Sequence, residues 1–224
     1  IEIPQIWNGG IAIYGGIIGA LIGAAIGCKT GKINFPNLLD LGALGLLIGQ
    51  GIGRWGNFFN QEAFGVNTTT APFRMWSQKI HDDLVSSADT LTAKGIEFDP
   101  NLPVHPTFLY ESVWCLLGFL ILNYMVHKHR HFKGEIFMLY GVWYGLERAV
   151  VEGLRTDSLY IGDTTLRVSQ LLSIAIVAVF AVAFVVCFIK YKKGTLWSAL
   201  QLDKVTDENI KNDEKTEVQN GTDN

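Results

Sequence analysis

A run of polar residues in the first third of the sequence has the composition of a functional site. It reads GRWGNFFNQE over residues 53–62 and follows the apolar, glycine-rich stretch 38–52. A guanidinium, carboxamides and a carboxylate therefore stand at the end of a segment that is apolar enough to enter a membrane. Ionisable groups at membrane depth are costly and usually mark a site for a charged substrate. We therefore expect a functional site here whose substrate carries charge.

A second set of polar residues follows a helical spacing at the end of a later apolar segment. Separations of four, four and three residues place its members on one helical face. They are Tyr144, Arg148, Glu152 and Arg155.

The two arginines Arg54 and Arg148 indicate the chemistry of the substrate. A guanidinium offers a planar fork of donors and keeps its charge in a low-dielectric site, so it suits a phosphate. A phospholipid would present its phosphate at this depth, with its acyl chains between the helices. The alternative is structural ion pairing, of Arg148 with Glu152 and of Arg54 with Glu62. Two cations near one site leave spare positive charge, which favours anion binding.

Five apolar segments could carry these residues across a membrane. The clearest covers residues 168–189, and at about 1.5 Å per residue it crosses a hydrocarbon core of roughly 30 Å. The other four carry polar insertions and cover residues 9–28, 36–53, 106–126 and 134–151. Five such segments predict an all-α polytopic membrane protein with about five transmembrane helices.

Positive residues follow the first, third and fifth of these segments. They are Lys29, Lys32, Lys128, Arg130, Lys133, Lys190, Lys192 and Lys193. With five alternating spans, all three clusters face one side, which the distribution of lysine and arginine identifies as the cytoplasm. The loop 62–105 and the start of the chain then face outside.

This topology gathers the unusual polar groups at the outer side. Tyr14 lies near the outer end of the first segment, and His105 and Glu111 stand at the outer start of the third. Each also has a plainer reading. Tyr14 and Tyr144 could be interfacial aromatic residues, His105 could simply begin a helix, and Glu111 could only hydrogen-bond a neighbouring span. The convergence of these groups at one depth predicts the site.

Glycines recur every fourth residue in the first two segments. They are Gly15, Gly19, Gly23 and Gly27, followed by Gly45, Gly49 and Gly53. Such ridges predict close packing of helix backbones.

The remaining composition bounds the domains and partners. Residues 201–224 hold seven acidic residues and three lysines without apolar periodicity, which predicts a disordered, acidic cytoplasmic tail. Residues 1–200 are predicted to form one membrane-embedded domain with the loop 62–105 inserted as an outer cap. No strongly basic face indicates nucleic acid. The cysteines Cys28, Cys115 and Cys187 lie in apolar stretches without metal or redox spacing, so we expect apolar packing and no metal site.

The run GRWGNFFNQEAFG at residues 53–65 resembles the signature of the bacterial prolipoprotein diacylglyceryl transferases. Further matches, spread over residues 9–157, are GGIAIYGG at 9–16, Asn37 with Asp40, HPT at 105–107 with Tyr110 and Glu111, and YG at 144–145 with Arg148, Glu152, Arg155 and Asp157. The family is described as having seven spans with its amino terminus outside. Five spans here imply two missing upstream, which agrees with a chain that begins at Ile1 rather than Met.

The resemblance implies a reaction and a location. The diacylglyceryl group of phosphatidylglycerol would pass to the cysteine thiol of a prolipoprotein signal peptide, giving a thioether and glycerol 1-phosphate. The partners are phosphatidylglycerol, prolipoprotein signal peptides and the lipid bilayer, and no cofactor is implied. The protein would lie in the bacterial plasma membrane as a multi-pass protein with its active site toward the outer face.

The resemblance also implies roles for single residues. Arg54 would bind the head group, and Arg148 would stabilise the phosphate as it leaves, because charge builds on that oxygen in the transition state. Asn57 and Glu62 would position the head group or Arg54. The other residues implied to bind phosphatidylglycerol are Gly65, Tyr144, Glu152 and Arg155.

The proton acceptor stays open. Tyr14 stands at a position that is a histidine in several relatives, and a neutral tyrosine is a poor base. Either Tyr14 positions the substrate, or another group such as His105 takes the proton, or no single base is required.

Two other functions compete with the transferase. Outward-facing arginines and glycine-rich helices would also suit a transporter or channel for an anionic solute. The third candidate is a non-catalytic, lipid-binding scaffold. The cytoplasmic half offers only Asp40 and Asn123 as polar interruptions, which argues against a transport pathway.

Overall fold

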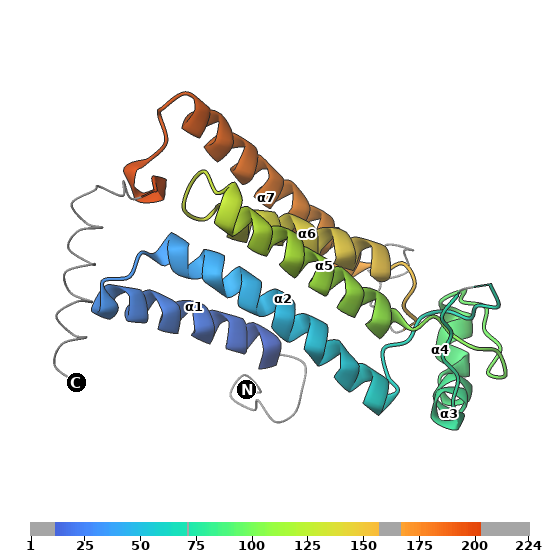
Figure 1. Ribbon diagram of the computed structural model, residues 1–224. Helices are drawn as coiled ribbons and strands as arrows, with labels where there is room; N and C mark the ends of the chain where they lie inside the picture. The colour runs from blue at the N-terminus through green and yellow to red at the C-terminus, as the bar shows by residue number, and fades with distance from the viewer. Residues whose placement is uncertain (1–11, 71, 157–166, 203–224) are drawn as a thin grey trace, which may run out of the picture.

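The computed structural model describes residues 12–70, 72–156 and 167–202, and these residues form a helical protein (Figure 1). The long helices are α1 (Ala12–Gly31), α2 (Phe35–Asn60), α5 (Thr107–Lys128), α6 (Glu135–Val151) and α7 (Val168–Lys192). Two short helices, α3 (Gln78–Ser86) and α4 (Ala88–Ala93), lie between α2 and α5, and a single 3-10 turn covers Ser198–Leu200. Pairing between extended segments in this part of the chain is limited to isolated bridges.

Three of the described helices are long and apolar enough to cross a membrane, namely α2, α5 and α7. The 25 residues of α7 extend about 37 Å at a rise of 1.5 Å per residue, which exceeds a hydrocarbon core of about 30 Å. The length and composition of these helices therefore confirm the prediction of a helical membrane protein. Helices α1 and α6 lie where the other two spans were predicted, but α6 has 17 residues. The count of five spans stays a prediction.

Helix α2 carries the first arginine, and its ends have clear local causes. Asn34 caps its amino end by accepting a hydrogen bond from the Asn37 N–H, and a proline stands in the first turn. The helix ends at Gln61, which adopts a left-handed conformation with φ 51°. Arg54 therefore lies about two turns before the end of the helix.

The long helices alternate in direction, so their ends gather in two groups at opposite ends of the structure (Figure 1). The carboxyl ends of α2 and α6 and the amino ends of α5 and α7 lie toward α3 and α4. The opposite end holds the carboxyl ends of α1, α5 and α7, where the three positive clusters stand. The three clusters therefore share one end of the described helices, and their position on one side of the membrane stays a prediction.

Packing between α5 and α6 fixes the centre of the bundle. The rings of Trp114 and Trp143 stack with centroids 4.5 Å apart. Each indole N–H donates to the backbone carbonyl of the other tryptophan, at 3.2 and 3.1 Å. A Cβ atom on Gly118 would lie 2.4 Å from the Trp143 Nε1, so this glycine makes room for the ring.

The predicted glycine ridges are not where the described helices approach most closely. A Cβ atom on any of the ridge glycines would meet no heavy atom within 4 Å in the described part of the chain. Close contact occurs instead at Gly118, Gly141 and Gly145, where an added Cβ would clash with Trp143, Phe180 and Val177. The closest helix contacts in the described part of the chain therefore do not use these ridges, because a four-residue spacing identifies a helix face but not its partner. Close packing of the ridges stays a prediction.

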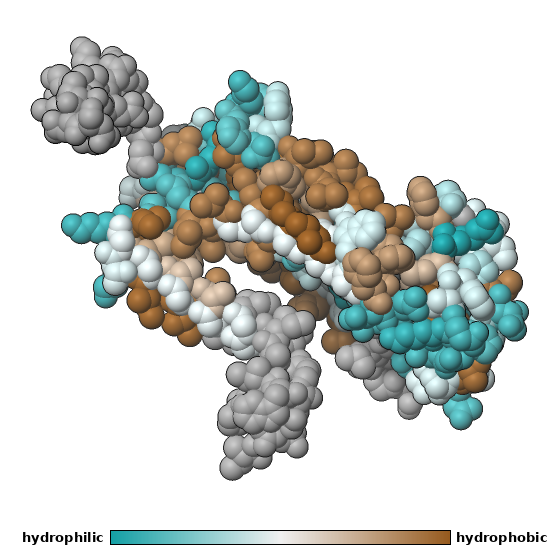
Figure 2. All heavy atoms as spheres, turned by 60° about the horizontal axis from the view of Figure 1, so that its bottom comes forward, coloured by the Kyte–Doolittle hydropathy of each residue, from teal (hydrophilic) through white to brown (hydrophobic). Residues whose placement is uncertain are grey.

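The segment between α2 and α5 has an apolar core of its own. Phe64, Ile80, Leu84, Leu91 and Val104 are buried together there, with Met75, Ile96 and Phe98 packed against them. Figure 2 shows hydrophobic side chains over much of the long helices and many hydrophilic side chains over this end of the molecule. Its role as a cap stays a prediction, and the predicted acidic tail lies almost entirely outside the described residues, which end at Leu202.

Candidate functional site

Backbone and side-chain hydrogen bonds join three chain segments at the end near α3 and α4. The Thr107 hydroxyl donates to the Ala63 carbonyl. The Gly65 N–H donates to the His105 carbonyl at 2.9 Å, and the Val66 N–H donates to the Leu154 carbonyl at 2.8 Å. The chain leaving α2 therefore runs between the entry to α5 and the exit from α6, which fixes these helix ends relative to one another.

Gly65 lies at the centre of this junction. A Cβ atom there would stand 2.8 Å from the His105 Cβ and 3.0 Å from the Leu154 carbonyl oxygen. A side chain at this position would push the two flanking segments apart. The structure thus gives Gly65 a packing role, and its predicted contact with substrate stays a prediction.

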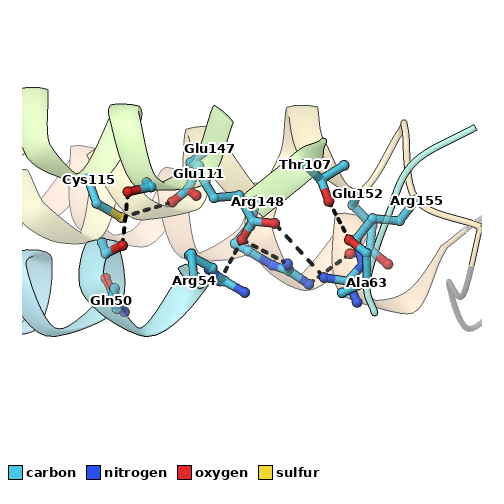
Figure 3. A network of polar contacts seen from close by, with 12 residues as sticks. Gln50, Arg54, Ala63, Thr107, Glu111, Cys115, Glu147, Arg148, Glu152 and Arg155 are labelled. Atoms are coloured by element: carbon cyan, nitrogen blue, oxygen red, sulfur yellow. Dashed lines mark hydrogen bonds and ion pairs between the residues drawn. The ribbon is translucent and has the colours of Figure 1, made fainter. Parts of the chain in front are cut away.

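Three arginines converge on Glu111, a residue that is only 1% exposed. Arg54 on α2 approaches closest, with its Nη2 atom 2.6 Å from the Glu111 Oε2 atom. Arg148 on α6 and Arg155 beyond its end lie 3.9 and 4.0 Å from the same carboxylate. Figure 3 shows these side chains within a network that runs from Gln50 and Cys115 to Arg155 and Ala63. We call Arg54, Arg148, Arg155, Glu111 and Glu152 the arginine cluster.

The second carboxylate of the arginine cluster is Glu152. Its Oε2 atom accepts a hydrogen bond from the Arg148 Nη2 at 2.8 Å, one helical turn away. The ion pair of Arg148 with Glu152, considered as an alternative to anion binding, is therefore present. Three arginines against two carboxylates leave the cluster a formal charge of +1. Its guanidiniums are 14 to 22% exposed, so solvent screens them little.

The alternative considered for Arg54, an ion pair with Glu62, is not formed. Arg54 pairs with Glu111 from another helix. Glu62 is exposed, and its carboxylate accepts a hydrogen bond from the Asn60 side chain at 3.2 Å. The physical reason is the left-handed residue Gln61, which ends α2 and turns the chain before Glu62.

The other predicted binding residues lie on the same helices or directly after them, outside the arginine cluster. Asn57 lies on α2 three residues after Arg54, and its carbonyl accepts the Glu62 N–H at 3.0 Å. Glu62 lines a cavity of about 400 Å³ between the end of α2 and helices α3 and α4. Tyr144 is half-buried on α6, where its ring stacks on Tyr140 with centroids 5.9 Å apart.

Of the two candidate proton acceptors, only the His105 side chain lies in the described part of the structure. Tyr14 lies in the first turn of α1, and its side chain is outside the described part of the structure. The His105 Nδ1 atom lies 3.0 Å from the Tyr110 hydroxyl. Among the described residues, the His105 side chain forms no hydrogen bond to the arginine cluster. Burial lowers the pKa of His105 below its ordinary value of 6.5, so the ring is mainly neutral at pH 7 and able to accept a proton.

This lowered pKa predicts a pH dependence of stability. As the pH falls below about 6.5, His105 takes up a proton more readily in the unfolded chain than in the folded chain. Its contribution to stability is therefore present above pH 6.5 and is lost as the pH falls through the folded-state pKa. We expect His105→Gln to lessen the decrease in unfolding temperature between neutral and acidic pH, measured by thermal unfolding in detergent.

The exposed His127, at the opposite end of the helices, provides the matched control for this measurement. The His127→Gln protein should keep the pH dependence of the unsubstituted chain. Identical pH dependence in the His105→Gln protein would contradict the prediction.

Two buried carboxylates were not among the predicted site residues. Glu111 was placed among the polar groups at the outer side, but no role in the site was assigned to it, and it organises the arginine cluster. Glu147 was overlooked. It is 4% exposed, its Oε2 atom lies 3.9 Å from the Cys115 sulfur, and its Oε1 atom has no hydrogen-bond partner among the described residues. Both residues could have been identified from the sequence, because a carboxylate within a predicted membrane span usually marks a functional site.

The three cysteines are all buried and free. Within the described ranges, no group of three or more His, Cys, Asp and Glu side chains is arranged to hold a metal ion. The arginine cluster can instead bind an anion, because its donors are charge-assisted, partly buried and held by two carboxylates.

Comparison with known proteins identifies relatives over most of the chain. The profile of a family described as prolipoprotein diacylglyceryl transferase matches residues 1–186. A Finegoldia magna protein is 45% identical over 197 residues, covering 88% of this chain and 68% of its own length. Proteins of Oceanobacillus iheyensis and Staphylococcus saprophyticus are 39% and 42% identical, covering 87% and 85% of this chain and 62% and 64% of their own lengths.

These three relatives share the name phosphatidylglycerol–prolipoprotein diacylglyceryl transferase. The chain therefore spans about two thirds of the length of the curated relatives it matches.

Proposed function

The chain belongs to the prolipoprotein diacylglyceryl transferase family, and from this membership we propose that it lipidates proteins. The reaction transfers the diacylglyceryl group of phosphatidylglycerol to the lipobox cysteine of a prolipoprotein. The thiol sulfur attacks the glycerol carbon that bears the phosphate ester, and the bond from that carbon to oxygen breaks. A thioether forms, glycerol 1-phosphate leaves with the bonding electrons, and the thiol proton passes to a base or to water.

The observation that carries this proposal is the convergence of Arg54, Arg148 and Arg155 on one buried carboxylate at the end of the helices. A lipid phosphate at this depth meets planar donors from two helices and from the segment after α6. The partial burial of the donors strengthens their attraction for an anion relative to water. The apolar helix surfaces beneath the cluster suit acyl chains.

The cluster acts on the transition state as well as on the bound lipid. As the carbon–oxygen bond breaks, negative charge grows on the departing phosphate. Arg148 stabilises that charge, while Arg54 holds the head group. Glu111 holds Arg54 and Arg148 within the same few ångströms, so little reorganisation is needed during the reaction. Glu111 is thus a positioning residue.

The proposed orientation follows from the positive end of the molecule. That end lies in the cytoplasm and the arginine cluster lies toward the outer face of the plasma membrane, in a multi-pass protein. The buried segment around Phe64 and Val104 then stands over the cluster as a cap, where a signal peptide presents its cysteine. His105, beside this segment and mainly neutral, is the proposed proton acceptor among the described residues, with Tyr14 as a positioning group.

Family membership does not favour a transporter or channel. The decisive experiment incubates the protein with phosphatidylglycerol and a peptide that bears a lipobox cysteine, and follows the peptide by mass spectrometry. We expect the mass of one diacylglyceryl group to be added to the cysteine and glycerol 1-phosphate to be released in equal amount. A peptide whose cysteine is replaced by serine serves as the control. An unmodified cysteine peptide would refute the proposal, and anion flux through liposomes would then favour the transporter.

A further inference from the structure

A second cavity, of about 390 Å³, lies at the opposite end of the helices from the arginine cluster. It is bounded by the first turn of α2, the last turn of α5, the loop from α5 to α6 and the segment that follows α7. Four of its lining residues are basic side chains. They are His127, Lys128, Arg130 and Lys133.

The central cation of this cavity is held in place by buried acceptors. The Arg130 Nη2 atom lies 2.7 Å from the Oδ2 atom of Asp40, a side chain only 4% exposed. Arg130 also donates to the Asn37 side chain and to the Phe132 carbonyl. The same Asp40 carboxylate accepts the Gly134 N–H at 2.8 Å and the Phe137 N–H at 2.9 Å. The ion pair and these hydrogen bonds therefore hold the Arg130 side chain in one position.

The wall of the cavity is fixed as well. Glu135, 1% exposed, accepts the N–H groups of His131 and Phe132, the latter at 3.3 Å. The Lys133 N–H donates to the Leu200 carbonyl at 2.8 Å, which ties the loop to the segment after α7. Two buried carboxylates, Asp40 and Glu135, thus hold the loop in the conformation that shapes the cavity.

The charges around the cavity favour an anion. Lys128, Arg130 and Lys133 carry three positive charges, and the buried Asp40 and Glu135 that hold the loop supply two negative charges. Among the described residues, the side chains that line the cavity itself include basic groups and no acidic group. The volume lies within the range typical of sites for small ligands.

The surroundings of the cavity indicate a lipid as the source of the anion. Val126 and Leu202 add apolar surface to the lining. One to two turns before the end of α5, Leu120, Ile121 and Tyr124 expose 63, 45 and 59% of their surface. An acyl chain attached to an anion in the cavity has an apolar helix surface to lie along.

We propose that this cavity binds the phosphate-bearing head group of an anionic membrane lipid in the leaflet opposite the arginine cluster. Basic pockets between helices at the cytoplasmic level are suited to such head groups. The site is separate from the arginine cluster and is independent of the proposed transfer reaction. Its occupant would attach the loop between α5 and α6, and the segment after α7, to the membrane surface.

Native mass spectrometry of the full chain in detergent tests this proposal. The probe is phosphatidic acid, and an Arg148→Gln background weakens anion binding at the arginine cluster. We expect Lys128→Gln to weaken binding of phosphatidic acid about fivefold, the effect of removing one lysine near an anionic head group. The matched control is Lys193→Gln, which removes an exposed lysine at the same end but outside the cavity, and it should keep the affinity within about twofold.

The source of the anion is tested by competition. Millimolar inorganic phosphate should leave phosphatidic acid bound, because the acyl chains contribute to binding. Displacement of the lipid by inorganic phosphate would assign the cavity to a free anion and overturn the lipid proposal. Equal affinities of the Lys128→Gln and Lys193→Gln proteins would overturn the site itself, because both proteins have lost one positive charge from the same end.

Discussion

Replacing Arg148 by alanine is expected to lower the turnover rate of diacylglyceryl transfer about 100- to 1000-fold, the usual loss when one preorganised donor to a developing anion is removed. Arg148 is 18% exposed and lies between Glu111 and Glu152. Because this position is mostly buried, water compensates little for the loss of the positive charge. The rate is measured by mass spectrometry of the lipobox peptide under saturating phosphatidylglycerol.

Two further variants separate charge, geometry and general damage. Arg148→Lys keeps the charge but loses the planar fork, so its rate should fall between those of the unsubstituted protein and Arg148→Ala. Arg74→Ala removes an exposed arginine of the loop that is not part of the arginine cluster, and its guanidinium donates to the Thr69 carbonyl at 3.0 Å. This control should keep the rate within about twofold. A turnover of more than a tenth in Arg148→Ala would contradict the proposed role.

Replacing Glu111 by glutamine is expected to lower the free energy of unfolding by about 3–5 kcal/mol, the cost of leaving buried charge without its partner. Glu111 is 1% exposed and in ion-pair contact with three arginines from different parts of the chain. Glutamine has nearly the same shape, so the loss reports charge rather than packing. The stability is measured by thermal or chemical unfolding in detergent.

The matched control for this variant is Glu97→Gln, because Glu97 is exposed in the loop segment. Its unfolding free energy should change by less than about 0.5 kcal/mol. A second measurement separates the site from general stability. Inorganic phosphate should raise the unfolding temperature of Glu111→Gln more than that of the unsubstituted protein, because an external anion can replace the lost carboxylate. Equal effects of phosphate on both proteins would contradict the picture of Glu111 as the internal anion of the cluster.

The apolar segments determined the positions of the helices. Their length and composition predict helices from the residues alone, since a chain in a membrane must satisfy its backbone hydrogen bonds within each segment. The ends of α5 and α7 agree with the predicted segments within a few residues, while α2 continues to Asn60, seven residues past the predicted end at Gly53. The polar residues Arg54 and Asn57 therefore lie within the last turns of α2 and not beyond it.

Helix spacing also placed Tyr144, Arg148 and Glu152 on one face, and the alternation of the spans put Arg54 and Arg148 at the same end of the molecule. Local spacing could not say which acidic residue each arginine meets. The acidic partner considered for Arg54 as an alternative to anion binding was Glu62, eight residues later, but Arg54 pairs with Glu111, fifty-seven residues later on another helix. Residues 62 and 111 are equally acidic in the sequence, and only one of them is buried.

The sequence by itself determined that helices of this protein enter a membrane, that arginines gather at one end of them, and that the chain resembles a family acting on a phospholipid. Each of these properties depends on residue type, on spacing along the chain and on the order of the apolar segments. Only the tertiary structure decided that Glu111 joins the arginines, that Gly65 is a packing position, and that Asp40 and Arg130 shape a second basic cavity at the opposite end. These contacts depend on the rotation and depth of one helix against another, which are set by the packing of pairs such as Trp114 and Trp143 and not by the pattern within either helix.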